Sequence, residues 1–168
     1  MARAVAGLAL LVLLAPAIAH AAPAAPGFKV KTFDGRATLD SRMLIGRTVL
    51  VLRFQASYCT PCTRESAALA ALAERYRGRG VDVWAIHVQD TVADTRAWVE
   101  AQKATYPVAL DPRLTVANRY GFKGAPYTVV VDRKGEIAWR FAGESAPTRL
   151  PRVLDDILAR DKRPSRKL

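Results

Sequence analysis

The chain has 168 residues, of which 51% are hydrophobic and 24% charged, so one domain with a real core is expected. Its 26 Lys and Arg residues outweigh 15 Asp and Glu residues, which gives a formal net charge of +11. The basic residues are scattered and lack the aromatic interleaving of single-strand binders, which argues against nucleic acid and favours a generally basic surface. Steering toward an acidic partner or an anionic membrane surface is the alternative.

The N-terminus has the pattern of a secretory signal, to which residues 1–21 are assigned. Arg3 gives a short positive region, and Leu8–Ala19 is an apolar stretch of about a dozen residues, too short for a membrane span of roughly 20. Ala19-His20-Ala21 fits a cleavage site, and an uncleaved membrane anchor is the alternative. No later segment is apolar enough to span a bilayer, so we expect no stable membrane insertion and a location in a bacterial periplasm or a similar oxidising space.

The rest of the chain divides into three parts. Residues 22–27 are an Ala/Pro-rich segment expected to be flexible, residues 28–160 are assigned to one domain, and residues 161–168 are a basic tail expected to be disordered. Within the domain, apolar β-branched runs predict strands and apolar residues at helical spacing predict helices. The expected strands span residues 28–33, 48–54, 81–88, 106–110, 127–132 and 136–141, and the expected helices span residues 63–77, 92–103, 111–120 and 148–160.

The order of these elements predicts the fold class. Helices between buried strands require crossover connections, which make the joined strands parallel. A hairpin turn at residues 133–135 then adds an antiparallel strand at the edge. The expected fold is therefore α/β, with a central mixed sheet flanked by helices.

Both cysteines of the chain lie in one motif, Cys59-Thr60-Pro61-Cys62, between a buried strand and a helix. A secreted protein stapled by disulfides would spread its cysteines, so this sulfur is more consistent with chemistry than with scaffolding. At a helix N-terminus, free backbone N–H groups and the positive dipole end stabilise a thiolate on Cys59. Pro61 falls in the first turn, where a missing N–H costs little. Cys59 is therefore expected to attack a partner disulfide, and Cys62 to attack Cys59 and release the reduced partner.

Two other uses of the cysteine pair are less consistent with the sequence. A zinc site needs about four ligands, and only His20 and His87 remain as further nitrogen ligands. A static structural disulfide across so small a loop would stabilise little, because the entropy gain grows with loop length. No metal or other cofactor is predicted.

The residues around the motif resemble a known family. Residues 54–65 (FQASYCTPCTRE) are similar to the F-W-A-S-W-C-x-P-C-x-x-E motif of the TlpA/ResA-like thiol-disulfide oxidoreductases, exported members of the thioredoxin superfamily. Residues 121–128 (GFKGAPYT) resemble the family's G-x-x-G-x-P-x-T segment, and residues 27–44 its N-terminal hairpin extension. The resemblance implies a thioredoxin-like fold with an N-terminal β-hairpin extension. Peroxiredoxins place a Thr three residues before their reactive cysteine, where this chain has Ala56.

The resemblance also implies a substrate groove. Pro126 would be a cis proline that faces the C-x-x-C motif across this groove. The backbone of Ala125 would then be free to pair with an extended substrate segment, as an added strand does. Tyr58 and Pro61, beside the cysteines, would contact the substrate as well.

Three further positions near the motif carry separate implications. Glu65 matches the family's acidic residue, whose implied role is to tune cysteine protonation or to relay protons; a first-turn Glu that favours the helix dipole is the alternative. Gln55 and Tyr58 replace two common tryptophans, and Gln55 puts polarity where apolar packing is usual. Arg53 stands where many thioredoxins carry a buried Asp. Its guanidinium would lower the pKa of the nearer cysteine, unless the side chain extends off the strand edge into solvent.

The expected function is an exported thiol-disulfide oxidoreductase that reduces specific protein disulfides, because Thr60-Pro61 lacks the His associated with strong oxidants of the superfamily. The resemblance implies protein thiol/disulfide clients in cytochrome c or copper-site maturation, and a membrane thiol transporter of the DsbD or CcdA kind as electron donor. The protein is expected to be a monomer. Two alternatives remain: a dithiol oxidase or isomerase of the same fold, and a Cu(I)-handling metallochaperone that uses the same thiols.

Overall fold

The computed structural model describes residues 22–161. The expected signal and most of the expected basic tail lie outside these residues. Within them, no helix combines the length and the apolar character needed to cross a bilayer.

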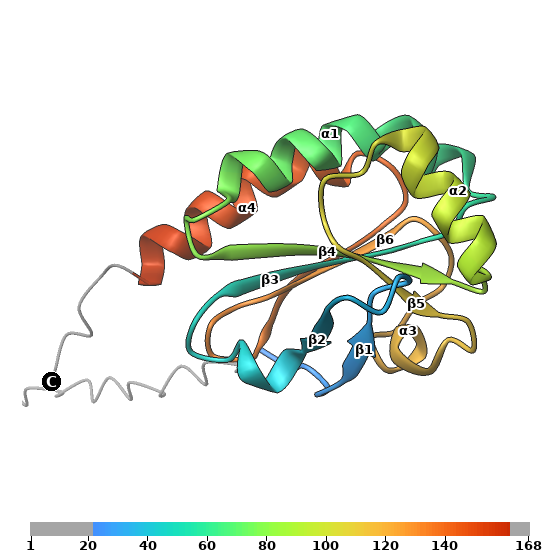
Figure 1. The fold of residues 1–168 in the computed structure, drawn as a ribbon. Helices are drawn as coiled ribbons and strands as arrows, with labels where there is room; N and C mark the ends of the chain where they lie inside the picture. Colours follow the sequence, from blue (N-terminus) through green and yellow to red (C-terminus); the bar gives the residue numbers. More distant parts are fainter. Residues whose placement is uncertain (1–21, 162–168) are drawn as a thin grey trace, which may run out of the picture.

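A five-stranded mixed sheet forms the centre of the fold (Figure 1). The three strands β5, β4 and β3 run parallel, β6 pairs antiparallel with β3, and β7 pairs antiparallel with β6 at the edge. The central strand β3 is buried at every position, as its apolar, β-branched sequence predicts. In spatial order the strands are β5 (Val108–Asp111), β4 (Val81–Val88), β3 (Val49–Gln55), β6 (Tyr127–Val131) and β7 (Ile137–Ala142).

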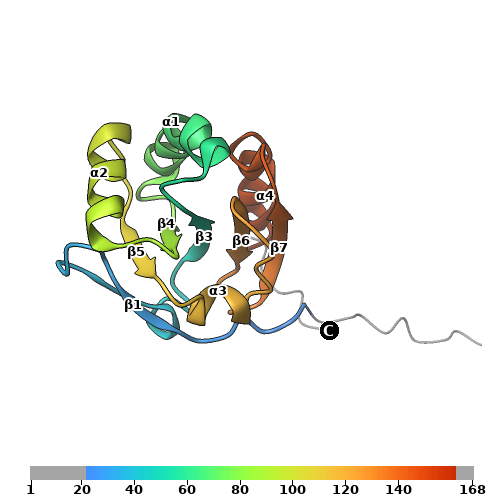
Figure 2. The ribbon, with the colours of Figure 1, turned by 90° about the vertical axis from the view of Figure 1, so that its right-hand side faces the viewer.

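Helices cover both faces of this sheet. Viewed end-on, α1, α2 and α4 lie on one face, while α3 and the strand β1 (Lys29–Lys31) lie on the other (Figure 2). The expected α/β fold with a central mixed sheet flanked by helices is confirmed. The helices are α1 (Thr60–Tyr76), α2 (Val92–Gln102), α3 (Thr115–Arg119) and α4 (Ala146–Asp161).

The N-terminal extension is a two-stranded antiparallel hairpin, β1 (Lys29–Lys31) and β2 (Thr38–Asp40), followed by the 3-10 turn η1 (Ser41–Met43). It joins the main fold where Thr32 forms an antiparallel bridge with Ala109 of β5. The segment 22–27 before it makes backbone hydrogen bonds to the turn between β6 and β7, including one of 2.8 Å from Ala25 N–H to the Gly135 carbonyl. The Ala/Pro-rich composition of this segment gave no sign of these contacts.

Three helix boundaries differ from the sequence-based expectation. Helix α1 begins at Thr60 rather than residue 63, because the side chain of Cys59 caps it. Helix α3 is shorter than expected, because Asp111 stays in β5 and its carboxylate accepts backbone N–H groups at the start of the helix. Helix α4 begins two residues early, and its first residues Ala146 and Pro147 are buried. Pro suits the first turn of a helix, where its missing N–H leaves no partner unsatisfied.

The sheet face under α1 changes character along its length. Val49 and Val51 of β3 pack against the apolar side of α1, in a cluster with Leu69, Leu72 and Tyr76. Alternate residues of a strand share a face, so Arg53 and Gln55 continue the same row toward the end of β3. Both are buried, each at 1% exposure. The layer beneath the first turns of α1 is therefore polar, and the C-x-x-C motif stands directly above it.

Candidate active site

The two cysteines lie where β3 passes through a short loop into α1. They form a disulfide, with 5.2 Å between their Cα atoms. Cys59 is the N-cap residue of α1, and its Sγ accepts a 3.2 Å hydrogen bond from the Cys62 backbone N–H. Pro61 lies in the first turn. In the reduced protein, this N–H and the positive end of the helix dipole favour a thiolate on Cys59, as the sequence predicted.

The two sulfurs differ in access. Cys59 keeps 7% of its surface exposed, whereas Cys62 keeps 1%. Only Cys59 contributes to the lining of the surface groove beside the motif. An attacking partner can therefore reach Cys59 but not Cys62, which is the geometry that the expected order of attack requires.

The groove joins segments that are far apart in the sequence. One wall comes from the loop after β3 and the start of α1, and the other from the segment before β6, with Gln89 after β4 completing the lining. The Ala125–Pro126 peptide bond is cis, which confirms that expectation. Tyr58 is 65% exposed at the groove, and its hydroxyl lies 3.5 Å from Oε1 of Gln89. The full lining is Tyr58, Cys59, Thr60, Pro61, Gln89, Phe122, Gly124 and Ala125.

Arg53 does not extend into solvent; that alternative is wrong. Its guanidinium is buried beneath α1, where it forms an ion pair with Glu65 and donates a 3.0 Å hydrogen bond to Thr128 Oγ1. Burial lowers the pKa of Arg53, and the neighbouring Glu65 opposes this shift. The second carboxylate oxygen of Glu65 accepts the backbone N–H of Ser145 before α4. One ion pair thus links β3, α1, β6 and the entry to α4 beneath the redox motif.

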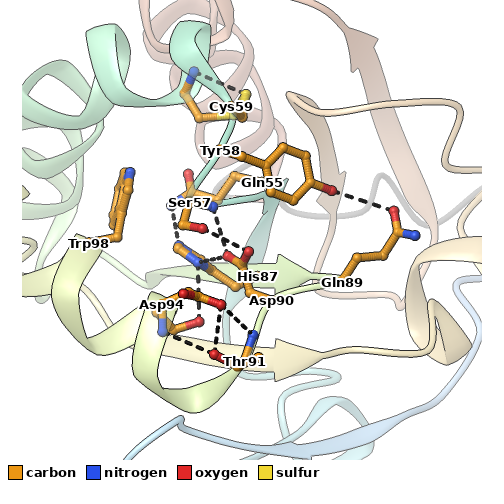
Figure 3. A network of polar contacts seen from close by, with 12 residues as sticks. Gln55, Ser57, Tyr58, Cys59, His87, Gln89, Asp90, Thr91, Asp94 and Trp98 are labelled. Carbon is orange, nitrogen blue, oxygen red and sulfur yellow. Dashed lines mark hydrogen bonds and ion pairs between the residues drawn. A yellow bond between two sulfur atoms is a disulfide. The ribbon is translucent and has the colours of Figure 1, made fainter.

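A second polar group was missed in the sequence. Gln55, His87 and Asp90 lie side by side below the loop that precedes Cys59, and Asp90 contacts Ser57 in that loop (Figure 3). Gln55 and His87 are register partners on β3 and β4, so the polarity of Gln55 is matched by its neighbour. The signal in the sequence was a histidine in a buried strand followed three residues later by an aspartate, but neither residue was assigned a role.

Metal-binding side chains do not gather around the motif. Between residues 22 and 161, no three His, Cys, Asp or Glu side chains come close enough together to hold a metal ion. His87 is held by Gln55 and Asp90.

A thioredoxin-like sheet with a C-x-x-C motif capping its first long helix, next to a cis proline, defines a thiol-disulfide oxidoreductase. Comparison with known proteins agrees with this class. The sequence model of the AhpC/TSA family matches residues 21–140, so the chain belongs to this family.

Curated relatives carry the same activity in their names. The chain is 28% identical over 120 residues to the thiol-disulfide oxidoreductase ResA of Halalkalibacterium halodurans, covering 71% of this chain and 67% of the relative. It is 26% identical over 133 residues to the protein of the same name from Bacillus anthracis, covering 79% and 76%.

Solved structures agree on the fold. A thiol:disulfide interchange protein of the thioredoxin family from Chlorobium tepidum superposes with a TM-score of 0.73 at 22% identity, covering 82% of this chain and 97% of that one. A secreted Mycobacterium tuberculosis disulfide oxidoreductase, described as homologous to Escherichia coli DsbE, gives a TM-score of 0.66 at 21% identity, covering 76% and 95%.

Proposed function

We propose that this protein reduces specific protein disulfides in the bacterial periplasm. The observation that supports this most directly is the asymmetry of the cysteine pair: Cys59 caps α1 and lines the groove, while Cys62 is buried behind it. A reductant needs one accessible thiolate to attack and one sheltered thiolate to resolve.

The reaction proceeds in two exchanges. The Cys59 thiolate attacks one sulfur of a client disulfide, so a mixed disulfide forms and the other client sulfur leaves as a thiolate. The Cys62 thiolate then attacks Cys59 Sγ, which forms the Cys59–Cys62 disulfide and releases the second client sulfur. Two electrons pass from the protein to the client, and the client thiolates take up protons from water.

The groove would hold the client during these steps. In the proposal an extended client segment pairs with the backbone of Ala125, next to the cis Pro126, as an added strand would. Tyr58 and Pro61 contact the segment from the other wall. A client segment held in this way would present its sulfur to Cys59 from the groove, while the Cys62 N–H contacts Cys59 Sγ from the helix.

Glu65 is proposed to act through its charge. Both of its oxygens are engaged, one by the Arg53 guanidinium and the other by the Ser145 N–H, which are interactions of an ionised carboxylate. Because both oxygens already accept hydrogen bonds, of its two expected roles we favour tuning of the cysteine thiolates over proton relay. Arg53 and Glu65 oppose each other, and the potential at the cysteines is set by the difference between them.

The cellular setting remains a prediction from the sequence. It comprises a secretory signal at residues 1–21, a monomeric domain at residues 28–160 and a basic tail after it. Reducing power in an oxidising compartment must be supplied from outside, and a membrane thiol transporter of the DsbD or CcdA kind fits that need. Residues 124–126 (GAP) resemble the cytochrome c maturation branch of the superfamily, which favours cytochrome c apoproteins, with copper-site proteins as the other client class.

The reduction potential of the Cys59–Cys62 couple tests the direction of electron flow. A value near the thioredoxin end, roughly −270 mV, supports a reductant, whereas a value near roughly −120 mV would show an oxidase. The Cys62→Ser variant should accumulate a mixed disulfide with its client, and Cys59→Ser should be inactive and trap nothing. Absence of a trapped partner, together with stoichiometric Cu(I) binding by the wild type, would instead support a metallochaperone.

A further inference from the structure

The loop before Cys59 is a tight turn in which one backbone N–H needs a hydrogen-bond acceptor from outside the turn. Residues 56–59 form the turn, closed by a 3.1 Å hydrogen bond from Cys59 N–H to the Ala56 carbonyl. This bond leaves the N–H of Ser57, inside the turn, without a partner in the turn. Ser57 is half-buried, where a backbone N–H without a partner is still costly, so the conformation of this loop depends on what Ser57 contacts.

Asp90, in the loop between β4 and α2, meets Ser57 at two points (Figure 3). Its Oδ2 accepts the Ser57 backbone N–H at 2.7 Å, and its Oδ1 accepts the Ser57 hydroxyl at 2.8 Å. Asp90 is 5% exposed, so water competes little for these bonds. The neighbouring residues also meet: the hydroxyl of Tyr58 lies 3.5 Å from Oε1 of Gln89.

Asp90 is itself positioned by His87, which in turn contacts Gln55. His87 Nδ1 lies 2.7 Å from Asp90 Oδ2, and His87 Nε2 lies 2.9 Å from the Gln55 side-chain nitrogen. A carboxylate only accepts and an amide nitrogen only donates, so the imidazole carries its proton on Nδ1 and accepts at Nε2. Burial lowers the pKa of His87, which fits this neutral form. Gln55 therefore donates to His87, and His87 and Ser57 both donate to Asp90; these four residues are called here the Asp90 network.

A second connection runs from the same histidine to the other side of the motif. The Trp98 ring of α2 packs edge-on against His87, with 4.9 Å between ring centres. Its Nε1–H donates a 3.1 Å hydrogen bond to Thr63 Oγ1 in α1, one residue after Cys62. Ser57 before the redox pair and Thr63 after it are therefore both connected to His87, the first through Asp90 and the second through Trp98.

We propose that Asp90 is a positioning residue for thiol-disulfide exchange: by fixing Ser57 it holds Cys59 and Tyr58 in the orientation that an incoming disulfide requires. The inference rests on the proposed function, since the reaction it serves is the attack of Cys59. It adds a role to three residues, Gln55, His87 and Asp90, that carry none in the exchange mechanism itself.

Two substitutions separate position from charge. Asn at 90 can accept the Ser57 and His87 N–H groups through its oxygen and donate from its NH2 group to the Ser57 hydroxyl, so Asp90→Asn keeps the geometry and removes the charge. Asp90→Ala removes all three bonds. Asp94→Ala is a matched control: this exposed residue lies four positions further along the chain and caps α2 together with Thr91, and its hydrogen bonds go to Thr91 rather than to Ser57.

The test is the rate at which each reduced variant attacks oxidised glutathione, measured by stopped flow from acid to alkaline pH. Circular dichroism checks that each variant is folded. Asp90→Ala is expected to lower the plateau rate about tenfold or more, because small misplacement of a reacting group is costly. The kinetic pKa of Cys59 should stay unchanged, and Asp90→Asn and Asp94→Ala should remain close to wild type.

Two results would overturn the proposal. One is a folded Asp90→Ala variant that attacks as fast as the wild type. The other is an Asp90→Asn variant that is as slow as Asp90→Ala and has a shifted kinetic pKa, which would show that charge rather than position matters. If Asp90→Ala does not fold, Asp90→Ser replaces it; its single, shorter hydroxyl cannot take the place of both carboxylate oxygens on the Ser57 N–H and hydroxyl, and an unchanged rate would again refute the role. Failure of the wild type to attack glutathione at all would count instead against the proposed function.

Discussion

The ion pair between Arg53 and Glu65 makes an asymmetric prediction about stability. The Arg53 side chain is 1% exposed, whereas that of Glu65 is 15% exposed. Glu65→Leu leaves a buried guanidinium with Thr128 Oγ1 as its remaining side-chain partner. Arg53→Met leaves a carboxylate that still accepts the Ser145 N–H and still reaches solvent. Loss of the anion should therefore cost more than loss of the cation.

The expected magnitudes follow from the burial of each charge. Removing one partner of a buried pair typically costs about 3–5 kcal/mol, so we expect about 4 kcal/mol for Glu65→Leu. For Arg53→Met we expect about 2 kcal/mol, the range of a charge-assisted hydrogen bond. The double variant replaces the pair with two apolar side chains and should cost about 2 kcal/mol, well below the roughly 6 kcal/mol of independent sites.

Urea unfolding of the oxidised protein, followed by circular dichroism, measures all four free energies. Arg53→Lys is a useful companion, because it keeps the charge and loses the planar fork that reaches two partners. The reasoning is refuted if Glu65→Leu is no more destabilising than Arg53→Met, or if the costs of the two single substitutions add in the double variant.

Three further predictions concern single groups. Burial lowers the pKa of His87, so the unfolded chain takes up its proton first; stability should be complete above about pH 6.5 and fall below it. An NMR titration midpoint at or above that value would contradict this. Burial raises the pKa of Tyr106 and Tyr120 to about 12 and also raises the pKa of Tyr76, so stability should fall as pH rises past about 10, and absorbance titration should show these three tyrosines titrating late. Tyr58→Ala, at an exposed site, should change the unfolding free energy by less than about 0.5 kcal/mol yet slow reduction of insulin more than of glutathione disulfide; equal effects would remove Tyr58 from the client contacts.

Features encoded by neighbouring residues were predictable from the sequence. The cap at Cys59 and the tolerance for Pro61 both follow from local helix chemistry, and the structure has both. The central strand was predictable because a run of apolar residues dominates it, as expected of a strand buried along its whole length. The cis bond before Pro126 was not predictable in this way, since most X–Pro bonds are trans; the resemblance of residues 121–128 supplied it.

Features that depend on partners distant in the sequence were out of reach. Arg53 reads as an anomaly in an apolar strand until the fold brings Glu65 and Thr128 to it. Gln55 likewise has no explanation until its register partner His87 is known. Local patterns describe the hydrophobicity of a position, but they do not contain the identity of the residue across the ladder.

The polar layer beneath α1 has a consequence for how sequences of this kind can diverge. Arg53 and Glu65 pair their opposite charges, and Gln55, His87 and Asp90 hydrogen-bond to one another and to Ser57. An isolated replacement in either group leaves a buried donor, acceptor or charge unmatched, whereas a concerted replacement does not. Each group is therefore expected to be inherited or lost as a unit. Among relatives, two correlated blocks of substitutions should mark the positions aligned with Arg53 and with His87.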